Sequence, residues 1–339
     1  MMSLGIGVLV TLLTTAVILR LVERHAPALG LMDVPNERSS HSRPTPRGGG
    51  IGIVVGSVLG IFVSLVMGGS TDLASAAVVL AAAMSVALVS LIDDLRELPV
   101  LVRLATHLAA ASWVVAWLPT PTVLELPLLP PVTLGGAAPI LAVLWVVGVT
   151  NVYNFMDGID GLAGGQGLVA GATWGGVGLL VGDRFVAACG FAIAAACAIF
   201  LARNWAPARI FMGDAGSAFL GFLLAVLPLL VGGAPPGSRS WALGAVVLWP
   251  FLFDTTLTLV RRAVRGENIL QAHRSHLYQR LVVNGATHGA VSGLYVLLAA
   301  AAALIGVGWA LGQLPGWLVV GVTSVEVVVL MLLVRRRER

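Results

Sequence analysis

Apolar residues are gathered into long runs along the whole of this chain, and short polar segments separate one run from the next. Most of the runs approach the roughly 20 residues that an α-helix needs to cross the hydrocarbon core of a bilayer. The run at 137–149 is shorter, and we expect it to continue toward Phe155. The pattern predicts an all-α, polytopic transmembrane helical bundle of about 10–11 spans, with candidate spans at 4–22, 49–67, 73–92, 99–118, 137–149, 164–182, 184–202, 217–233, 241–260, 289–311 and 316–334.

The composition agrees with a chain whose solvent is the lipid bilayer. Of 339 residues, 58% are hydrophobic and only 11% are charged, and the mean hydropathy is +0.96. Such a chain carries too little charge to cover a water-facing surface. We therefore expect residues 1–339 to form a single integral-membrane domain, with the bilayer as a partner and no sizeable soluble part. Cys189 and Cys197 lie inside one apolar run and are interpreted as packing residues.

The arginines predict the orientation of the bundle. One alternating set of loops and adjoining helix ends holds 18 arginines, whereas the opposite set holds only Arg184 and Arg239. Because positive residues favour the cytoplasmic side, the N-terminus is predicted to be periplasmic and the C-terminus cytoplasmic. The first run has no basic segment before it and is interpreted as a retained helix. A pI near 9.8 is explained by this topology, so no nucleic-acid partner is predicted.

Dense polar sequence falls on the predicted cytoplasmic side, which hydropathy alone does not require. The opposite loops are short and rich in turn residues, except for residues 119–136, whose prolines and Val-Leu-Glu-Leu run predict a small hairpin or an interfacial segment. The first inward loop holds arginines, a histidine and a glycine triplet that opens a helix. These residues suit phosphate oxygens, but a positively charged membrane anchor explains them equally well: Arg38, His41, Arg43, Arg47 and Gly48–Gly50.

Two adjacent acids, Asp93 and Asp94, close the third run. Neighbouring carboxylates at a membrane boundary repel each other and are costly unless a cation or a basic group joins them. A hard divalent cation bound partly through substrate phosphates would do so. The alternative is a solvated helix end, in which Arg96 and Glu97 form ordinary surface pairs.

The segment between the fifth and sixth runs is rich in amides and acids. Asn151, Asn154 and Asp157 would share one face if all three were helical, and Asp160 follows shortly after them. Such a face could recognise a base, a ribose or an N-acetyl group, and the glycines after Asp157 would let backbone approach a ligand. An Asp-Gly turn that caps two helices is the simpler alternative.

Two further acids stand at informative places. Asp214 lies between glycines where the eighth run begins, which suits either an exposed metal ligand or an N-cap of that helix. Asp254 lies inside the ninth run, where an acid without a partner would be costly.

The loop after the ninth run carries His273, Arg274 and His276. On a helix the two histidines would share a face. They could form half a zinc site, but no third ligand stands at the spacing of a zinc-protease motif. Phosphate binding beside the arginines is the interpretation we favour. The remaining isolated histidines are interpreted as structural: His25, His107 and His288.

Taken together, these motifs resemble the polyprenyl-phosphate N-acetylhexosamine-1-phosphate transferase family. This superfamily contains the phospho-muramoyl-pentapeptide translocase and the undecaprenyl-phosphate N-acetylglucosamine-1-phosphate transferases. The resemblance runs from the first inward loop through the histidine loop, and it rests on Asp93-Asp94, the segment 151–165, the Phe-Met-Gly-Asp-Ala-Gly-Ser segment at 211–217 and the His-Arg-Ser-His sequence at 273–276.

The resemblance implies an enzyme of the bacterial inner membrane with its active site on the cytoplasmic face. Such an enzyme transfers N-acetylhexosamine 1-phosphate from a UDP-sugar to undecaprenyl phosphate and releases UMP. It also implies Mg²⁺ as the cofactor, which Mn²⁺ could replace, and leaves a homodimer open. The catalytic residues would be Asp93, Asp94, Asp214, His273 and His276; the metal ligands Asp214, Asp94 and Asp157; and the substrate-binding residues Arg47, Asn151, Asn154, Asp157, Asp160, Asn204 and Arg274.

Two departures from the muramoyl-peptide enzymes favour another branch of the family. The histidine loop lacks their clustered histidines, and Arg47 precedes the glycines where those enzymes carry a Thr-Pro-Thr-Met type of segment. The initiators of O-antigen and other surface polysaccharides resemble this chain more closely. The alternatives are the peptidoglycan translocase and, from another class, a membrane transporter, because an acid inside a membrane helix also suits a substrate pathway.

Overall fold

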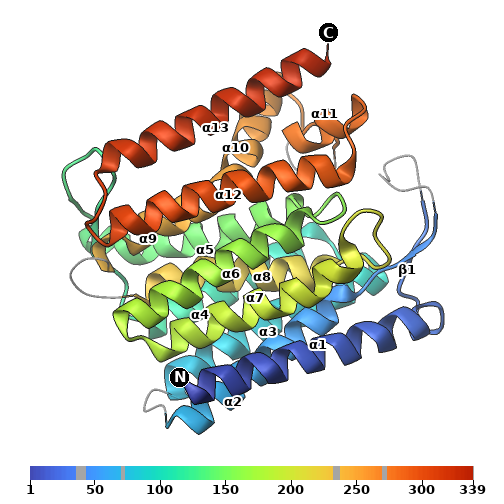
Figure 1. Ribbon diagram of the computed structural model, residues 1–339, viewed down its shortest axis with the longest axis horizontal. Helices are drawn as coiled ribbons and strands as arrows, with labels where there is room; N and C mark the ends of the chain where they lie inside the picture. The colour runs from blue at the N-terminus through green and yellow to red at the C-terminus, as the bar shows by residue number, and fades with distance from the viewer. Residues whose placement is uncertain (36–42, 70–72, 232–236, 269–272, 339) are drawn as a thin grey trace.

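The computed structural model describes residues 1–35, 43–69, 73–231, 237–268 and 273–338, and these ranges are mostly helical. Figure 1 shows long helices lying roughly side by side, with the two termini at opposite ends of the bundle. The helices are α1 (Met2–Leu29), α2 (Gly49–Gly68), α3 (Leu73–Arg96), α4 (Val100–Trp117), α5 (Ala138–Phe155), α6 (Leu162–Val181), α7 (Arg184–Asn204), α8 (Asp214–Leu230), α9 (Gly237–Val247), α10 (Trp249–Val264), α11 (Leu277–Val283), α12 (His288–Ala310) and α13 (Gly316–Arg337).

Each of the eleven apolar runs forms helix, and α5 extends to Phe155 as expected. Within the described ranges, eight helices are long and apolar enough to cross a membrane. The run at 241–260 is divided between α9 and α10, which meet at a bend of 71° and would make a ninth span. The other two runs form α6 and α8. The prediction of an all-α, polytopic membrane bundle is confirmed.

Helix α8 occupies the centre of the bundle and packs against α2, α3 and α5. From Ala215 to Leu229 all of its residues are buried, because it is apolar around its whole circumference and has no polar face to turn outward. Its N-terminus is therefore held at a fixed place, at the end of the bundle where α3 and α5 finish and where α2, α4 and α6 begin. The candidate residues gather at this end.

A short pair of antiparallel strands lies at each end of the bundle. Near the candidate residues, β1 (Met32–Asp33) pairs with β2 (Thr45–Pro46). At the opposite end, β3 (Val123–Leu124) pairs with β4 (Val132–Thr133), followed by a 3₁₀ turn at Gly135–Ala137. The hairpin within residues 119–136 is thus confirmed.

Candidate active site

The carboxylate of Asp94 binds the N-terminus of α8. It accepts hydrogen bonds from the backbone N–H groups of Asp214 and Ala215, both at 3.1 Å, and its side chain is only 2% exposed. These two donors are among the first-turn N–H groups that lack a partner within the helix. The N-cap position of α8 is occupied by Gly213, which has no side chain to cap the helix, and Asp214 is already the first helical residue. The capping role that Asp214 could have had therefore belongs to Asp94, and the Asp214 carboxylate is available for other contacts.

Gly213 makes this close approach possible. Its φ of 75° lies in the left-handed region, and a Cβ there would stand 2.9 Å from an Asp94 carboxylate oxygen. Any side chain at this position would push Asp94 away from the start of α8.

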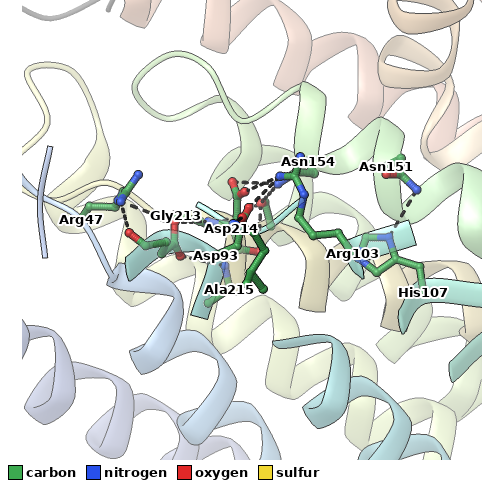
Figure 2. Close-up of polar contacts among 12 residues, drawn as sticks. Arg47, Asp93, Arg103, His107, Asn151, Asn154, Gly213, Asp214 and Ala215 are labelled. Carbon is green, nitrogen blue, oxygen red and sulfur yellow. Dashed lines mark hydrogen bonds and ion pairs between the residues drawn. The ribbon is translucent and has the colours of Figure 1, made fainter. Parts of the chain in front are cut away.

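Arg103 of α4 joins two of the acids. Its Nη1 atom lies 2.7 Å from Asp93 Oδ2 and 3.3 Å from Asp214 Oδ2. Asn154 of α5 donates to Asp214 Oδ1 at 3.0 Å and to the Ser217 hydroxyl at 2.9 Å. Figure 2 shows these side chains converging on Asp214 from separate helices. The Asp214 side chain remains 36% exposed, compared with 9% for Asp93, so Asp214 is the member of this group that a ligand can reach.

Asp157 adds a further acid beside this cluster, in the turn between α5 and α6. Because α5 ends at Phe155, Asp157 is not helical, and the predicted helical face ends at Asn154. Burial first, and then the charges of Asp214 and Asp94, raises the pKa of Asp157 to about 8. Mutual repulsion among closely placed carboxylates favours a bound cation.

The geometry of these acids limits how a metal could bind. The described residues contain no group of three or more His, Cys, Asp or Glu side chains arranged to hold one ion. Mg²⁺ often takes only one or two protein carboxylates and completes its shell with water and substrate phosphates. The carboxylates of Asp214 and Asp157 suit this kind of site.

The sequence suggested that the N–H groups of the glycine triplet could bind a ligand, but in the structure these groups already have partners. The N–H groups of Gly48 and Gly49 donate to the carbonyl of Phe211, and that of Gly50 donates to the carbonyl of Met212. The phosphate-binding hypothesis for these amides is therefore wrong: they join the start of α2 to the loop before α8.

Arg47 lies next to the glycines and does reach the acid cluster. Its Nε atom is 3.6 Å from Asp94 Oδ1, and its Nη2 atom donates to the Asp94 carbonyl. Arg43 is exposed. Two other members of the first-loop hypothesis, Arg38 and His41, lie outside the described residues.

Asp160 and Asn204 are not part of the Asp214 cluster. Their side chains join the turn between α5 and α6 to the loop between α7 and α8. Asp160 Oδ1 lies 3.2 Å from His288 Nδ1, and its Oδ2 accepts from the Ala208 N–H at 3.0 Å. Asn204 is 5% exposed; its amide accepts from Gly161 N–H and donates to the Ile210 carbonyl. Although burial opposes it, hydrogen bonding to His288 and Ala208 leaves the pKa of Asp160 below its usual value.

Asn151 lies one turn before Asn154. Its amide donates to the Val147 carbonyl at 2.7 Å and lies 3.4 Å from His107 Nδ1 of α4. Figure 2 shows this pair to one side of Asp214, beyond Arg103.

Asp254 is fully buried and anchors the histidine loop. Its Oδ1 accepts from Leu277 N–H at 2.7 Å, and its Oδ2 accepts from Tyr278 N–H at 3.1 Å and from the Tyr295 hydroxyl at 2.6 Å. His276 Nδ1 lies 3.3 Å from Oδ1. The acid inside the membrane run is thus partnered, and it fixes the start of α11.

The two histidines of the loop differ in access. His276 is 3% exposed and stacks on His273, whose ring centroid is 5.0 Å away. Burial, His276 and Arg262 lower the pKa of His273 to about 4, so its ring is neutral at pH 7. Arg274 is exposed beside them.

Tyr278 connects the histidine loop to the α5–α6 turn. Its hydroxyl donates to the Phe155 carbonyl at 3.1 Å, and a Cβ on Gly158 would stand 2.1 Å from that hydroxyl. The loop is therefore held against the turn that carries Asp157.

Several residues of this site were missed as candidates by sequence reasoning. In the sequence, Arg103 contributes only to the positive-inside bias, and His107 and His288 are isolated histidines. A polar residue one or two turns from a helix end is the only signal that the sequence held for them, because each partner lies far away along the chain: Arg103 with Asp214, His107 with Asn151, and His288 with Asp160.

Comparison with known proteins gives a consistent result. The family model described as "Glycosyl transferase family 4" matches residues 50–232. A protein of Bacillus subtilis named "Probable undecaprenyl-phosphate N-acetylglucosaminyl 1-phosphate transferase" is 32% identical over 289 residues, which is 85% of this chain and 80% of that protein.

Two further relatives come from other bacteria. The "Decaprenyl-phosphate N-acetylglucosaminephosphotransferase" of Mycobacterium tuberculosis is 34% identical, with 78% of this chain and 72% of that protein aligned. A "Phospho-N-acetylmuramoyl-pentapeptide-transferase" of Synechococcus is 36% identical over a shorter stretch, with 58% of this chain and 56% of that protein aligned. Because the family model covers more than half of the chain and two relatives align with most of it, the chain belongs to glycosyl transferase family 4.

Proposed function

We propose that this protein transfers N-acetylhexosamine 1-phosphate from a UDP-sugar to undecaprenyl phosphate, at the cytoplasmic face of the bacterial inner membrane. The products are undecaprenyl-diphosphate-sugar and UMP, and the step initiates synthesis of a surface polysaccharide. One observation carries the proposal: Asp93, Asp94 and Asp214 come together at one end of the bundle, where Asp214 stays open to a ligand beside Arg103.

The reaction brings two anions together. An oxygen of the lipid phosphate attacks the β-phosphorus of the nucleotide sugar, the bond to the bridging oxygen breaks, and UMP leaves with the electron pair. The acceptor phosphate is largely dianionic at neutral pH, so a general base is optional, and Asp93 and Asp94 are candidates on the acceptor side only. Charge neutralisation and in-line positioning supply most of the catalysis in such transfers.

The chain's own residues would divide this work. Arg103 and Arg47 lower the repulsion between phosphates and acids, and Asp94 fixes the start of α8 and so places Asp214. The Asn154 amide orients the Asp214 carboxylate. His273, neutral and hydrogen-bonded to the Ser275 hydroxyl at 2.9 Å, could contact a phosphate or sugar oxygen.

A divalent cation fits the donor set. Asp214 and Asp157 would hold Mg²⁺, and Mn²⁺ could replace it because both prefer oxygen ligands. When bound, the ion would polarise the phosphoryl oxygens and neutralise the charge that develops on them.

The alternatives receive less support. A transporter places its main polar groups near the membrane midplane, whereas the described acids of this cluster gather at one end. The peptidoglycan translocase remains a related second candidate, since a relative with that name aligns with part of the chain.

The direct test is an assay of the purified full-length protein. With undecaprenyl phosphate, Mg²⁺ and a panel of UDP-sugars, we expect release of UMP from one N-acetylhexosamine donor, loss of activity on chelation with EDTA, and recovery when Mg²⁺ or Mn²⁺ is restored. UMP release from none of the donors would overturn the proposed activity. Activity that persists in EDTA would overturn the metal requirement alone.

Arg103 offers a second prediction. Arg103→Gln should lower turnover by about 100-fold, which is the size of effect seen when an active site loses one charge-stabilising group. The substitution removes the guanidinium group that Asp93 and Asp214 share. Arg103→Lys keeps a point charge and should retain at least a tenth of the activity. Equal rates for Arg103→Gln and the wild type would remove Arg103 from the mechanism.

A further inference from the structure

Arginines from three separate segments converge at the site end of the bundle, away from the acid cluster. Arg261 belongs to the last turn of α10, Arg280 to α11 and Arg335 to the last turn of α13. The three helices contact one another in pairs, and Arg337 Nη1 donates to the Asn284 carbonyl at 3.2 Å, so the ends of α11 and α13 meet. Arg261 is near enough to Arg280, Arg265, Arg335 and the acid Glu338 to interact with their charges. We call Arg261, Arg265, Arg280 and Arg335 the arginine cluster.

The nearby acids neutralise only part of this cluster. Glu338 is held by Arg280, whose Nε and Nη2 atoms donate to its two oxygens at 2.7 Å. Glu267 is 2.8 Å from Arg262 and 3.9 Å from Arg265. Arg336 and Arg337 follow Arg335 and add further positive charge. Among the described residues around the cluster, the arginines thus outnumber the acids, and like charges face one another.

Helix ends and membrane topology account for only part of this arrangement. Positive residues are favourable in the last turn of a helix and on the inner side of a membrane. Neither effect requires cations from three segments to face one another, which costs free energy unless an anion joins them.

Apolar side chains border the cluster. Val260 and Val264 flank Arg261 on the same outward face of α10, one turn apart, and are 53% and 83% exposed. Val283 of α11 is 69% exposed and Leu332 of α13 is 49% exposed. The opposite face of α10, with Asp254, Thr258 and Arg262, is buried. A small soluble anion has no apolar part that could pack against this border, whereas a phospholipid carries a charged headgroup directly above its acyl chains.

We propose that the arginine cluster binds the headgroup of an acidic phospholipid from the leaflet at this end of the bundle, with its acyl chains against Val260, Val264, Val283 and Leu332. Figure 1 shows α10, α11 and the end of α13 close together at this corner of the molecule. The bound lipid would tie α13 to α11, and so would steady the loop that carries the two histidines. Lipid binding itself does not depend on the proposed enzymatic activity.

The test measures lipid binding to the purified full-length protein by native mass spectrometry in detergent. Phosphatidylglycerol and phosphatidylcholine with identical acyl chains are titrated separately. We expect the wild type to bind phosphatidylglycerol at least tenfold more tightly. The double variant Arg261→Gln/Arg335→Gln should lose about tenfold or more of that affinity, since each basic residue near the membrane surface contributes roughly a factor of five.

Three controls make the result decisive. Arg20→Gln/Arg24→Gln removes two exposed arginines from α1 and should leave binding unchanged, and the charge-retaining Arg261→Lys/Arg335→Lys variant should restore most of it. Inorganic phosphate at millimolar concentration should not compete. Equal binding of both lipids, equal losses in the two glutamine variants, or displacement by phosphate would each overturn the proposal.

Discussion

Asp214→Asn is expected to reduce transfer by about a thousandfold or more while the protein still folds and inserts. Asp214 is the exposed acid of the cluster and contacts both Arg103 and Asn154. The asparagine keeps the shape of the side chain but removes the charge that a divalent cation needs, and a loss of several kcal/mol of transition-state stabilisation corresponds to this factor. Turnover is measured by UMP release.

A matched control separates chemistry from stability in this experiment. Asp183 caps α7 at the opposite end of the bundle, where its carboxylate accepts from the N–H groups of Phe185 and Val186. Asp183→Asn should cost at most about 1 kcal/mol of stability and leave turnover near the wild-type rate. If Asp214→Asn turned over as fast as Asp183→Asn, Asp214 would have no part in catalysis.

Asp254→Ala is expected to destabilise the protein by about 4 kcal/mol, because it leaves the Leu277 and Tyr278 N–H groups and the Tyr295 hydroxyl buried without their acceptor. The midpoint of thermal unfolding in detergent should fall by roughly 6 °C. Turnover of the remaining folded protein should also fall, since α11 and His273 lose their anchor.

Two milder variants test the same explanation. Thr258→Val removes one donor to Asp254, at 3.2 Å, and should cost about 1 kcal/mol. Asp254→Asn keeps one acceptor oxygen, so its loss of stability should lie between those of Thr258→Val and Asp254→Ala. An unfolding midpoint for Asp254→Ala within about 1 °C of the wild type, well below the loss expected for this buried group, would contradict the anchoring role.

Most of the helical architecture could be predicted from the sequence, because in a bilayer the backbone must satisfy its own hydrogen bonds and apolar runs of sufficient length become helices. The exceptions are local. The run at 241–260 contains a bend before Trp249 and Pro250, and α11 is too short for periodicity to reveal. Hydropathy also could not tell that α8 lies at the centre.

The candidate site, like the fold, was predictable from the sequence only in part. The sequence identified Asp93, Asp94, Asn154, Asp157 and Asp214 by residue type and by their place at run ends, and the structure brings them together. It could not tell that the glycines at 48–50 donate to the loop before α8, or that Asp160 and Asn204 join the α5–α6 turn to that same loop. Backbone partners far away along the chain leave no local pattern.

Hydropathy and spacing are local properties of the chain, and they are enough to identify a helical membrane protein with acids and amides at the ends of its apolar runs. The role of each of these groups cannot be derived from such local properties and depends on how the helices pack. Asp94 caps α8, Asp214 stays open, and Asp254 anchors α11, since each role depends on which donors the packing of distant helices brings within hydrogen-bonding distance.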